Sequence, residues 1–288
     1  MAMLRRLLQN LVRPAGPRRQ GVAADADTRP RMKPFFALFN KMYREPSFDQ
    51  KGGLQAFTAS LKALSEALEA NRPGGHAFLA DDTLVWFRNL GFLEDDDFVR
   101  ACAPHASDQI IRARIWRVYT LCWAARSCLG LPGDYVDIGC YDGKTVEIMA
   151  RYVGFAAQER SWYLYDVFDA PPEEARKSGH GPQLQAQVET RMRGLGRFRV
   201  IRGLVPASFE LGLPRDIAFV QLDLNVAAAE IACLERIYDR IVAGGLLVLD
   251  DYGFSRYRDT HEVEKRFFAQ RGASVLELPT GQGLVLKR

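Results

Sequence analysis

The feature of this sequence that most constrains its fold is a change of rhythm at Asp134. From there to the end of the chain, short apolar runs typical of buried strands alternate with longer segments of helical spacing. The strand-like runs are Tyr135–Ile138, Trp162–Tyr165, Phe198–Ile201, Ile217–Leu222, Leu246–Leu249, Val275–Leu278 and Gly283–Leu286. This alternation predicts an α/β fold, in which helices connect the strands of a mostly parallel sheet.

The spacing of the last two runs predicts the direction of the final strand. Only Pro279–Gln282 separates them, which fits a hairpin and is too short for a crossover helix. We therefore expect residues 131–288 to form a Rossmann-like, seven-stranded sheet whose last strand is antiparallel. Between the fourth and fifth runs, apolar residues at helical spacing predict a helix over Ala227–Val242.

Residues 34–130 show helical patterns and are predicted to form a helical cap that precedes the sheet domain. The expected helices are Gly52–Ala70, Asp81–Leu90, Asp95–Cys102 and Asp108–Leu129. In the last of these, the spacing of Trp116, Tyr119 and Trp123 is typical of core positions.

The first 33 residues form a basic tail. Eight Arg and Lys residues against Asp25 and Asp27 give this segment a charge of +6, so a net charge of +4 leaves −2 on the remaining chain. That balance argues against a nucleic-acid-binding body. Three interpretations of the tail stay open: a flexible leader, an amphipathic helix that contacts anionic lipid at a membrane surface, and an organelle transit peptide.

Cysteine usage and hydropathy favour a soluble protein of the reducing cytoplasm. The five cysteines are scattered without CxxC spacing, which argues against a disulfide framework or a zinc site. No apolar run reaches the length needed to span a bilayer.

Acidic residues follow two of the predicted strands. Asp223 comes after Ile217–Leu222, and Asp250 and Asp251 come after Leu246–Leu249. Parallel strands end at the same edge of a sheet, so these carboxylates should converge in the crevice where such sheets bind ligands. Converging carboxylates repel one another unless a cation or a proton lies among them. The alternative is that Asp250 and Asp251 cap the next helix.

A glycine-containing turn follows the first predicted strand. Asp137, Gly139 and Gly143 have the spacing D-x-G-x-x-x-G, which lets a ligand approach the backbone but does not match the dinucleotide fingerprint G-x-G-x-x-G. Asp166 ends the second strand, where an acidic side chain can accept hydrogen bonds from both hydroxyls of a ribose. His180, in the following loop, is open to interpretation as a lid residue, a base or a solvated side chain.

Several segments together resemble class I S-adenosylmethionine-dependent methyltransferases, and among them the macrocin/mycinamicin O-methyltransferase family. They are GDYVDIGCYDGKT at 133–145, YDVFDAPP at 165–172, IRGLVPASF at 201–209, QLDLN at 221–225 and GGLLVLDDYG at 244–253. The resemblance implies that Asp137, Gly139, Gly143 and Asp166 bind the methyl donor. It also implies a divalent cation, Mg²⁺, held by Asp223, Asp250 and Asp251.

The resemblance implies methyl transfer to a hydroxyl of a sugar in a glycan or secondary metabolite, with a small-molecule or glycan acceptor and self-association as a homo-oligomer. In that reaction, Asp223 would take the proton of the hydroxyl. Asn225 and Ala227 stand where the family often has Asp and Tyr. This departure leaves two alternatives open: a metal-independent methyltransferase, and a non-catalytic donor-binding protein whose basic tail binds a membrane or a partner.

Overall fold

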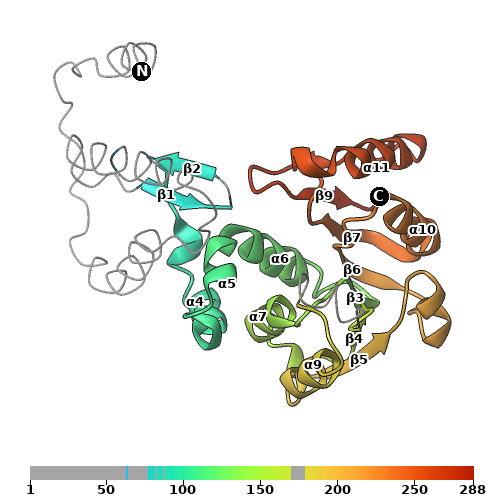
Figure 1. Ribbon diagram of the computed structural model, residues 1–288, viewed down its shortest axis with the longest axis horizontal. Helices are drawn as coiled ribbons and strands as arrows, with labels where there is room; N and C mark the ends of the chain where they lie inside the picture. Colours follow the sequence, from blue (N-terminus) through green and yellow to red (C-terminus); the bar gives the residue numbers. More distant parts are fainter. Residues whose placement is uncertain (1–62, 64–76, 82, 87, 170–178) are drawn as a thin grey trace, which may run out of the picture.

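A seven-stranded sheet forms the centre of the computed structural model, which describes residues 63, 77–81, 83–86, 88–169 and 179–288 (Figure 1). The strands are β3 (Asp134–Ile138), β4 (Ser161–Asp166), β5 (Arg197–Arg202), β6 (Ile217–Leu222), β7 (Ile241–Leu249), β8 (Leu276–Glu277) and β9 (Gly283–Leu286), in the spatial order β5-β4-β3-β6-β7-β9-β8. Strands β3 to β7 pair in parallel, whereas β9 is antiparallel to both β7 and β8. The predicted α/β fold with an antiparallel last strand is confirmed.

Helices cover both faces of this sheet (Figure 1). The helices are α4 (Asp96–Cys102), α5 (Gln109–Ala113), α6 (Ile115–Ser127), α7 (Lys144–Val153), α9 (Leu184–Met192), α10 (Ala227–Ile237) and α11 (Arg258–Gln270). Side chains alternate between the faces along each strand. Tyr135 packs with the residues of α6, α7 and α9, whereas its neighbour Val136 packs with those of α10 and α11.

An antiparallel hairpin lies where the sequence predicted a helix. Strands β1 (Ala77–Ala80) and β2 (Thr83–Trp86) pair with each other, so the helix expected over 81–90 is wrong, as is the all-helical character of the cap. Asp81 adopts a left-handed φ of 54°, which the two-residue connection of a hairpin requires. Runs of four residues are too short for periodicity to separate a strand from a helix.

Two predicted helices end or break earlier than expected. The segment 108–129 forms α5 and α6, because the backbone leaves the helical region at Arg114. The helix expected to reach Val242 ends at Ile237, and Ile241 already pairs with Ile217 in the sheet. Gly245 allows this strand to approach β6 closely, because a Cβ atom there would lie 2.9 Å from the backbone oxygen of Ala218.

The hairpin fixes the start of α6. The Asp81 carboxylate accepts the backbone N–H groups of Trp116 and Arg117, each at 3.0 Å, so a residue distant in sequence caps this helix. The ring of Phe78 packs edge-on against Trp116, with 5.4 Å between centroids. The sequence predicted that Trp116, Tyr119 and Trp123 lie in the core. Trp116 and Tyr119 are partly buried against it, whereas Trp123 is 45% exposed, so the prediction is wrong for Trp123.

Replacing Asp81 with Ala should lower the free energy of unfolding by about 1–2 kcal/mol, because α6 loses its cap. Burial raises the pKa of Asp81 from 3.8 to about 6 in the folded protein. A raised carboxyl pKa contributes stability that is fully present below the unfolded pKa and is lost as the pH rises through 6. Thermal unfolding should therefore show that Asp81→Ala loses more stability, relative to the wild type, at pH 5.5 than at pH 8. Glu94→Ala, which removes an exposed carboxylate, is the matched control, and an equal loss at both pH values would contradict this account.

The remaining predictions concern the cysteines, membrane-spanning helices, the N-terminal segments and the domain boundary. All five cysteines are buried, and each is free. No helix among the described residues has the length and apolar character that crossing a bilayer requires. The basic tail at 1–33 and the helix expected at 52–70 fall outside the described residues, except for Ala63. The division into a cap at 34–130 and a sheet domain from 131 stays a prediction, and α4 and α6 pack directly against α7.

Candidate active site

The carboxyl ends of β3, β4, β6 and β7 lie along one edge of the sheet. Backbone hydrogen bonds continue past the strands there, from Asp223 N–H to Ile138 O at 2.9 Å and from Asp250 N–H to Leu222 O at 3.0 Å. The structure brings Asp223, Asp250 and Asp251 together, with one carboxylate oxygen of each within 4.8 Å of the others. The predicted convergence of the three carboxylates is thus present in the fold.

Arg117 reaches this acidic cluster from α6. Its Nη2 donates to Asp250 Oδ2, to Asp251 Oδ1 at 2.9 Å and to the backbone oxygen of Asp250 at 2.5 Å. The guanidinium is buried and lies 5.0 Å from the centroid of the Phe254 ring. Arg117 was not among the site residues predicted from the sequence, but its contacts make it one.

The charges of the cluster remain unbalanced. With all three carboxylates ionised, the cluster and the Arg117 guanidinium together carry two negative charges, which one divalent cation would cancel. Among the described residues, no N–H group donates to Asp223 Oδ2 or Asp251 Oδ2, so both oxygens are available as ligands. Burial, and then the charges of Asp250 and Asp251, raise the pKa of Asp223 well above its ordinary value. The cluster therefore fits a hard divalent cation.

The glycine turn after β3 lies against the segment that carries Asp223. Gly139 has a φ of 92°, and a Cβ atom there would lie 1.8 Å from the backbone oxygen of Asp223. Only glycine allows this approach. Gly143 has a φ of 71° at the start of α7, where it packs against Val188 and Met192. Both glycines shape the turn.

Asp137 is fully buried at the end of β3. Neither of its carboxylate oxygens has a hydrogen-bond partner among the described residues, and burial raises its pKa well above the ordinary value. A buried carboxylate without a partner is costly. A cationic group of a bound ligand would supply that partner, so Asp137 fits a donor that carries an ammonium and a sulfonium.

Asp166 ends β4 beside the same turn. Its carboxylate accepts the backbone N–H groups of Tyr141 and Phe168, at 2.8 and 2.9 Å, and lies 3.0 Å from His180 Nε2. The His180 ring packs on Tyr141, with 5.2 Å between centroids. Of the interpretations left open for His180, this position favours a residue that covers the predicted ribose-binding carboxylate.

A cavity joins the glycine turn at 139–143, named here the donor turn, to the acidic cluster of Asp223, Asp250 and Asp251. Its lining includes Asp137, Gly139, Tyr141 and Asp223, and its volume is about 120 Å³. Ligand pockets usually measure about 300–1,000 Å³. A nucleoside ligand would therefore have to displace lining side chains, and Tyr141, which is 38% exposed, is well placed to move.

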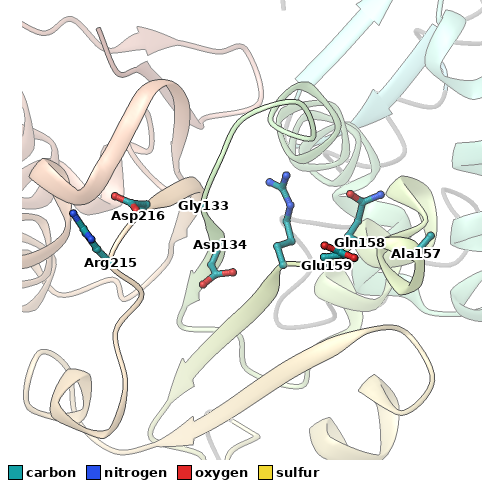
Figure 2. Close-up of a pocket in the computed structure, with 8 residues that line it drawn as sticks. Gly133, Asp134, Ala157, Gln158, Glu159, Arg215 and Asp216 are labelled. Atoms are coloured by element: carbon teal, nitrogen blue, oxygen red, sulfur yellow. The ribbon is translucent and has the colours of Figure 1, made fainter.

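A larger cavity, of about 540 Å³, lies at the opposite edge of the sheet, where the parallel strands begin (Figure 2). Figure 2 shows Arg215 and Asp216 across from Gln158 and Glu159. Arg160, which also lines this cavity, donates to the backbone oxygens of Cys128, Leu129 and Leu131. These contacts hold the connection from α6 to β3, and ligands of such sheets bind at the other edge.

The sequence profile of one family, described as macrocin-O-methyltransferase (TylF), matches residues 103–274, which is more than half of the chain. The chain belongs to this family. The match spans the acidic cluster, the donor turn and Arg117, and it includes α5 and α6 as well as β3 to β7 of the sheet.

Part of the chain is similar to a relative of known name. The chain is 25% identical over 157 residues to the 8-demethyl-8-(2,3-dimethoxy-alpha-L-rhamnosyl)-tetracenomycin-C 4'-O-methyltransferase of Streptomyces olivaceus, and this match covers 48% of the chain and 60% of the relative. The chain thus matches less than two thirds of that relative's length.

Two solved structures share the fold. The O-methyltransferase NovP has a TM-score of 0.51 at 14% identity, over 61% of this chain and 81% of that one. The calicheamicin methyltransferase CalS11 has a TM-score of 0.51 at 15% identity, over 84% of this chain and 99% of that one.

Proposed function

We propose that this protein is an S-adenosylmethionine-dependent O-methyltransferase that acts on a hydroxyl of a sugar in a glycan or secondary metabolite. The observation that carries the proposal is the shared cavity, in which Asp137 and Gly139 of the donor turn face Asp223 of the acidic cluster. The named activity of the Streptomyces olivaceus relative, on a rhamnosyl group of a natural product, supports a sugar acceptor of this class.

In this proposal Asp137 and Asp166 hold the two ends of the donor. Asp137 pairs with the cationic methionine end, and Asp166 accepts hydrogen bonds from the ribose hydroxyls. Tyr141 and His180 then cover the nucleoside side. This arrangement directs the sulfonium methyl toward the acidic cluster, and such positioning of two reactants supplies much of the rate of a transfer reaction.

Asp223 is the proposed base. It takes the proton of the acceptor hydroxyl as the new O–CH₃ bond forms and the S–CH₃ bond breaks, which releases S-adenosylhomocysteine. We assign Asp223, Asp250 and Asp251 as the ligands of a divalent cation, Mg²⁺. When bound, such a cation lowers the pKa of a coordinated hydroxyl and orients it.

A second candidate is a methyltransferase that needs no metal. The contacts of Arg117 with Asp250 and Asp251 favour it, because the guanidinium already supplies a positive charge to two of the three carboxylates. Turnover that survives thorough chelation would support this candidate, and turnover that is lost and then restored by Mg²⁺ would support the first.

The test of the proposed function combines binding with turnover. Calorimetry should detect S-adenosylhomocysteine binding to the purified protein, and a panel of glycosides should accept labelled methyl groups from S-adenosylmethionine. Asp166→Ala should weaken S-adenosylhomocysteine binding by about tenfold or more, because charged hydrogen bonds to the ribose are lost. Asp169→Ala, which removes a carboxylate that pairs with Arg202, is the control. The absence of donor binding in the wild-type protein would refute the proposal.

A further inference from the structure

Two buried glutamates pack against each other on the face of the sheet covered by α10 and α11. Glu230 of α10 is 5% exposed and Glu264 of α11 is 0% exposed. After burial, the charge of Glu230 and a hydrogen bond between the two carboxyl groups raise the pKa of Glu264. No N–H or O–H donor from the rest of the described chain bonds to either oxygen of Glu264. Two ionised carboxylates cannot share such a site without a cation, so one proton must lie between them.

Glu230 in turn holds the segment that follows Asp223. Its Oε1 accepts the backbone N–H of Asn225 at 2.9 Å and that of Leu224 at 3.3 Å. Asn225 has a left-handed φ of 58°, and its side-chain amide donates to Asp223 Oδ1 at 2.9 Å. A chain of hydrogen bonds therefore runs from the buried pair through the backbone of Asn225 to the carboxylate of Asp223.

We infer that Glu230 and Glu264 form a proton-sharing carboxyl pair that positions Asp223 for methyl transfer. Glu264 keeps the proton and donates it to ionised Glu230, and Glu230 uses its charge to bind the two backbone N–H groups. Hydrogen bonds to an ionised acceptor are about twice as strong as neutral ones. Both glutamates are positioning residues, because they act on the reaction through Asn225 and Asp223.

The surroundings of Glu264 favour its neutral form. Burial, followed by the charge of Glu230, raises the pKa of Glu264 to about 10. The other titratable groups that face it are Asp251 and Tyr252 from the segment after β7, and His261 lies one turn earlier on α11. Among these groups, none supplies a fixed positive charge at neutral pH that would favour an ionised Glu264.

Two substitutions of Glu264 distinguish the effect of losing its proton from the effect of changing its side-chain volume. Glu264→Gln keeps a neutral donor to Glu230, so amide hydrogen exchange at Leu224 and Asn225 should stay at its wild-type rate. Glu264→Leu keeps the bulk but removes the donor, and exchange at these amides should become about tenfold faster. With turnover as the readout, which rests on the proposed function, Glu264→Leu should lower kcat about tenfold with the donor KM within about twofold, and Glu264→Gln should restore kcat.

The pH dependence of unfolding tests the shared proton without any need for activity. A carboxyl with a raised folded pKa contributes stability that is present below the unfolded pKa and is lost as the pH rises toward 10. Glu264→Gln should therefore match the wild type near pH 5 and exceed its Tm by about 3 °C or more at pH 8.5. Glu262→Gln, which changes an exposed carboxylate on the same helix, should show no such difference between the two pH values.

These experiments distinguish a failure of the carboxyl-pair inference from a failure of the proposed function. Equal exchange at Leu224 and Asn225 in the Gln and Leu variants, or a Tm difference that does not change with pH, would overturn the carboxyl pair. If exchange and Tm behave as expected while the wild-type protein transfers no methyl group, the pair stands and the proposed function fails.

Discussion

Asp223→Asn should lower kcat about 10³-fold, because it removes both the proposed base and a proposed ligand of the cation. The side chain keeps its volume, and Gly139 contacts only the backbone of Asp223, so the donor turn should keep its shape. Calorimetry with S-adenosylhomocysteine should then give a dissociation constant within about threefold of the wild type, since the ribose contacts of Asp166 are unchanged.

The control for this substitution is Asp216→Asn. Asp216 is exposed and precedes β6 at the opposite edge of the sheet, whereas Asp223 follows the same strand. Each change removes one negative charge from one end of β6, but only Asp223 lies in the acidic cluster. An Asp223→Asn variant that kept more than a tenth of the wild-type kcat would rule out Asp223 as the base.

The fold and the acidic cluster could be predicted because both follow from patterns that are local in the sequence. Buried parallel strands read as continuous apolar runs, so β6 and β7 were recognisable from their residues alone. Once the strands are parallel, topology places Asp223 and Asp250 at one edge without any knowledge of side-chain contacts. The number of residues between Asp223 and Asp250 along the chain does not affect this placement.

Arg117 was missed because its partners are distant in sequence, yet a local signal was present. Leu121 and Ala124 follow it by four and seven residues and are 2% and 0% exposed, so Arg117 lies on the buried stripe of α6. Glu230 shows the same signal, with Leu234 and Ile237 on its side of α10. A charged residue at an apolar position of a helix needs a partner, and its spacing predicts burial although it cannot name that partner.

The hairpin at 77–86 could not be predicted from the same patterns. Its strands have four residues each, and the contact that makes it important is the capping of α6 by Asp81 from 35 positions away. Trp116 has core spacing within its own helix, but this spacing did not show that Phe78 of the hairpin would pack against it. Short strands that are stabilised by distant contacts carry little local information.

Arg117→Met should lower the free energy of unfolding by about 3–5 kcal/mol, because it leaves Asp250 and Asp251 buried without their charge partner. The Arg117 side chain is only 6% exposed, and those of Asp250 and Asp251 are 8% and 17% exposed, so water compensates little for the loss. Arg117→Lys keeps the charge but can reach only part of the contacts made by the planar guanidinium, and we expect a smaller loss. Denaturant unfolding in the presence of a chelator measures both.

Adding Mg²⁺ to these variants tests what the cluster binds. If three carboxylates hold a divalent cation, millimolar Mg²⁺ should raise the Tm of Arg117→Met by more than that of the wild type, because the variant cluster carries one more uncompensated negative charge. Arg236→Met removes an exposed arginine that pairs with Glu210, and it should show neither the stability loss nor the larger Mg²⁺ response. An Arg117→Met variant as stable as the wild type, and indifferent to Mg²⁺, would mean that the guanidinium does not compensate the acidic cluster in solution.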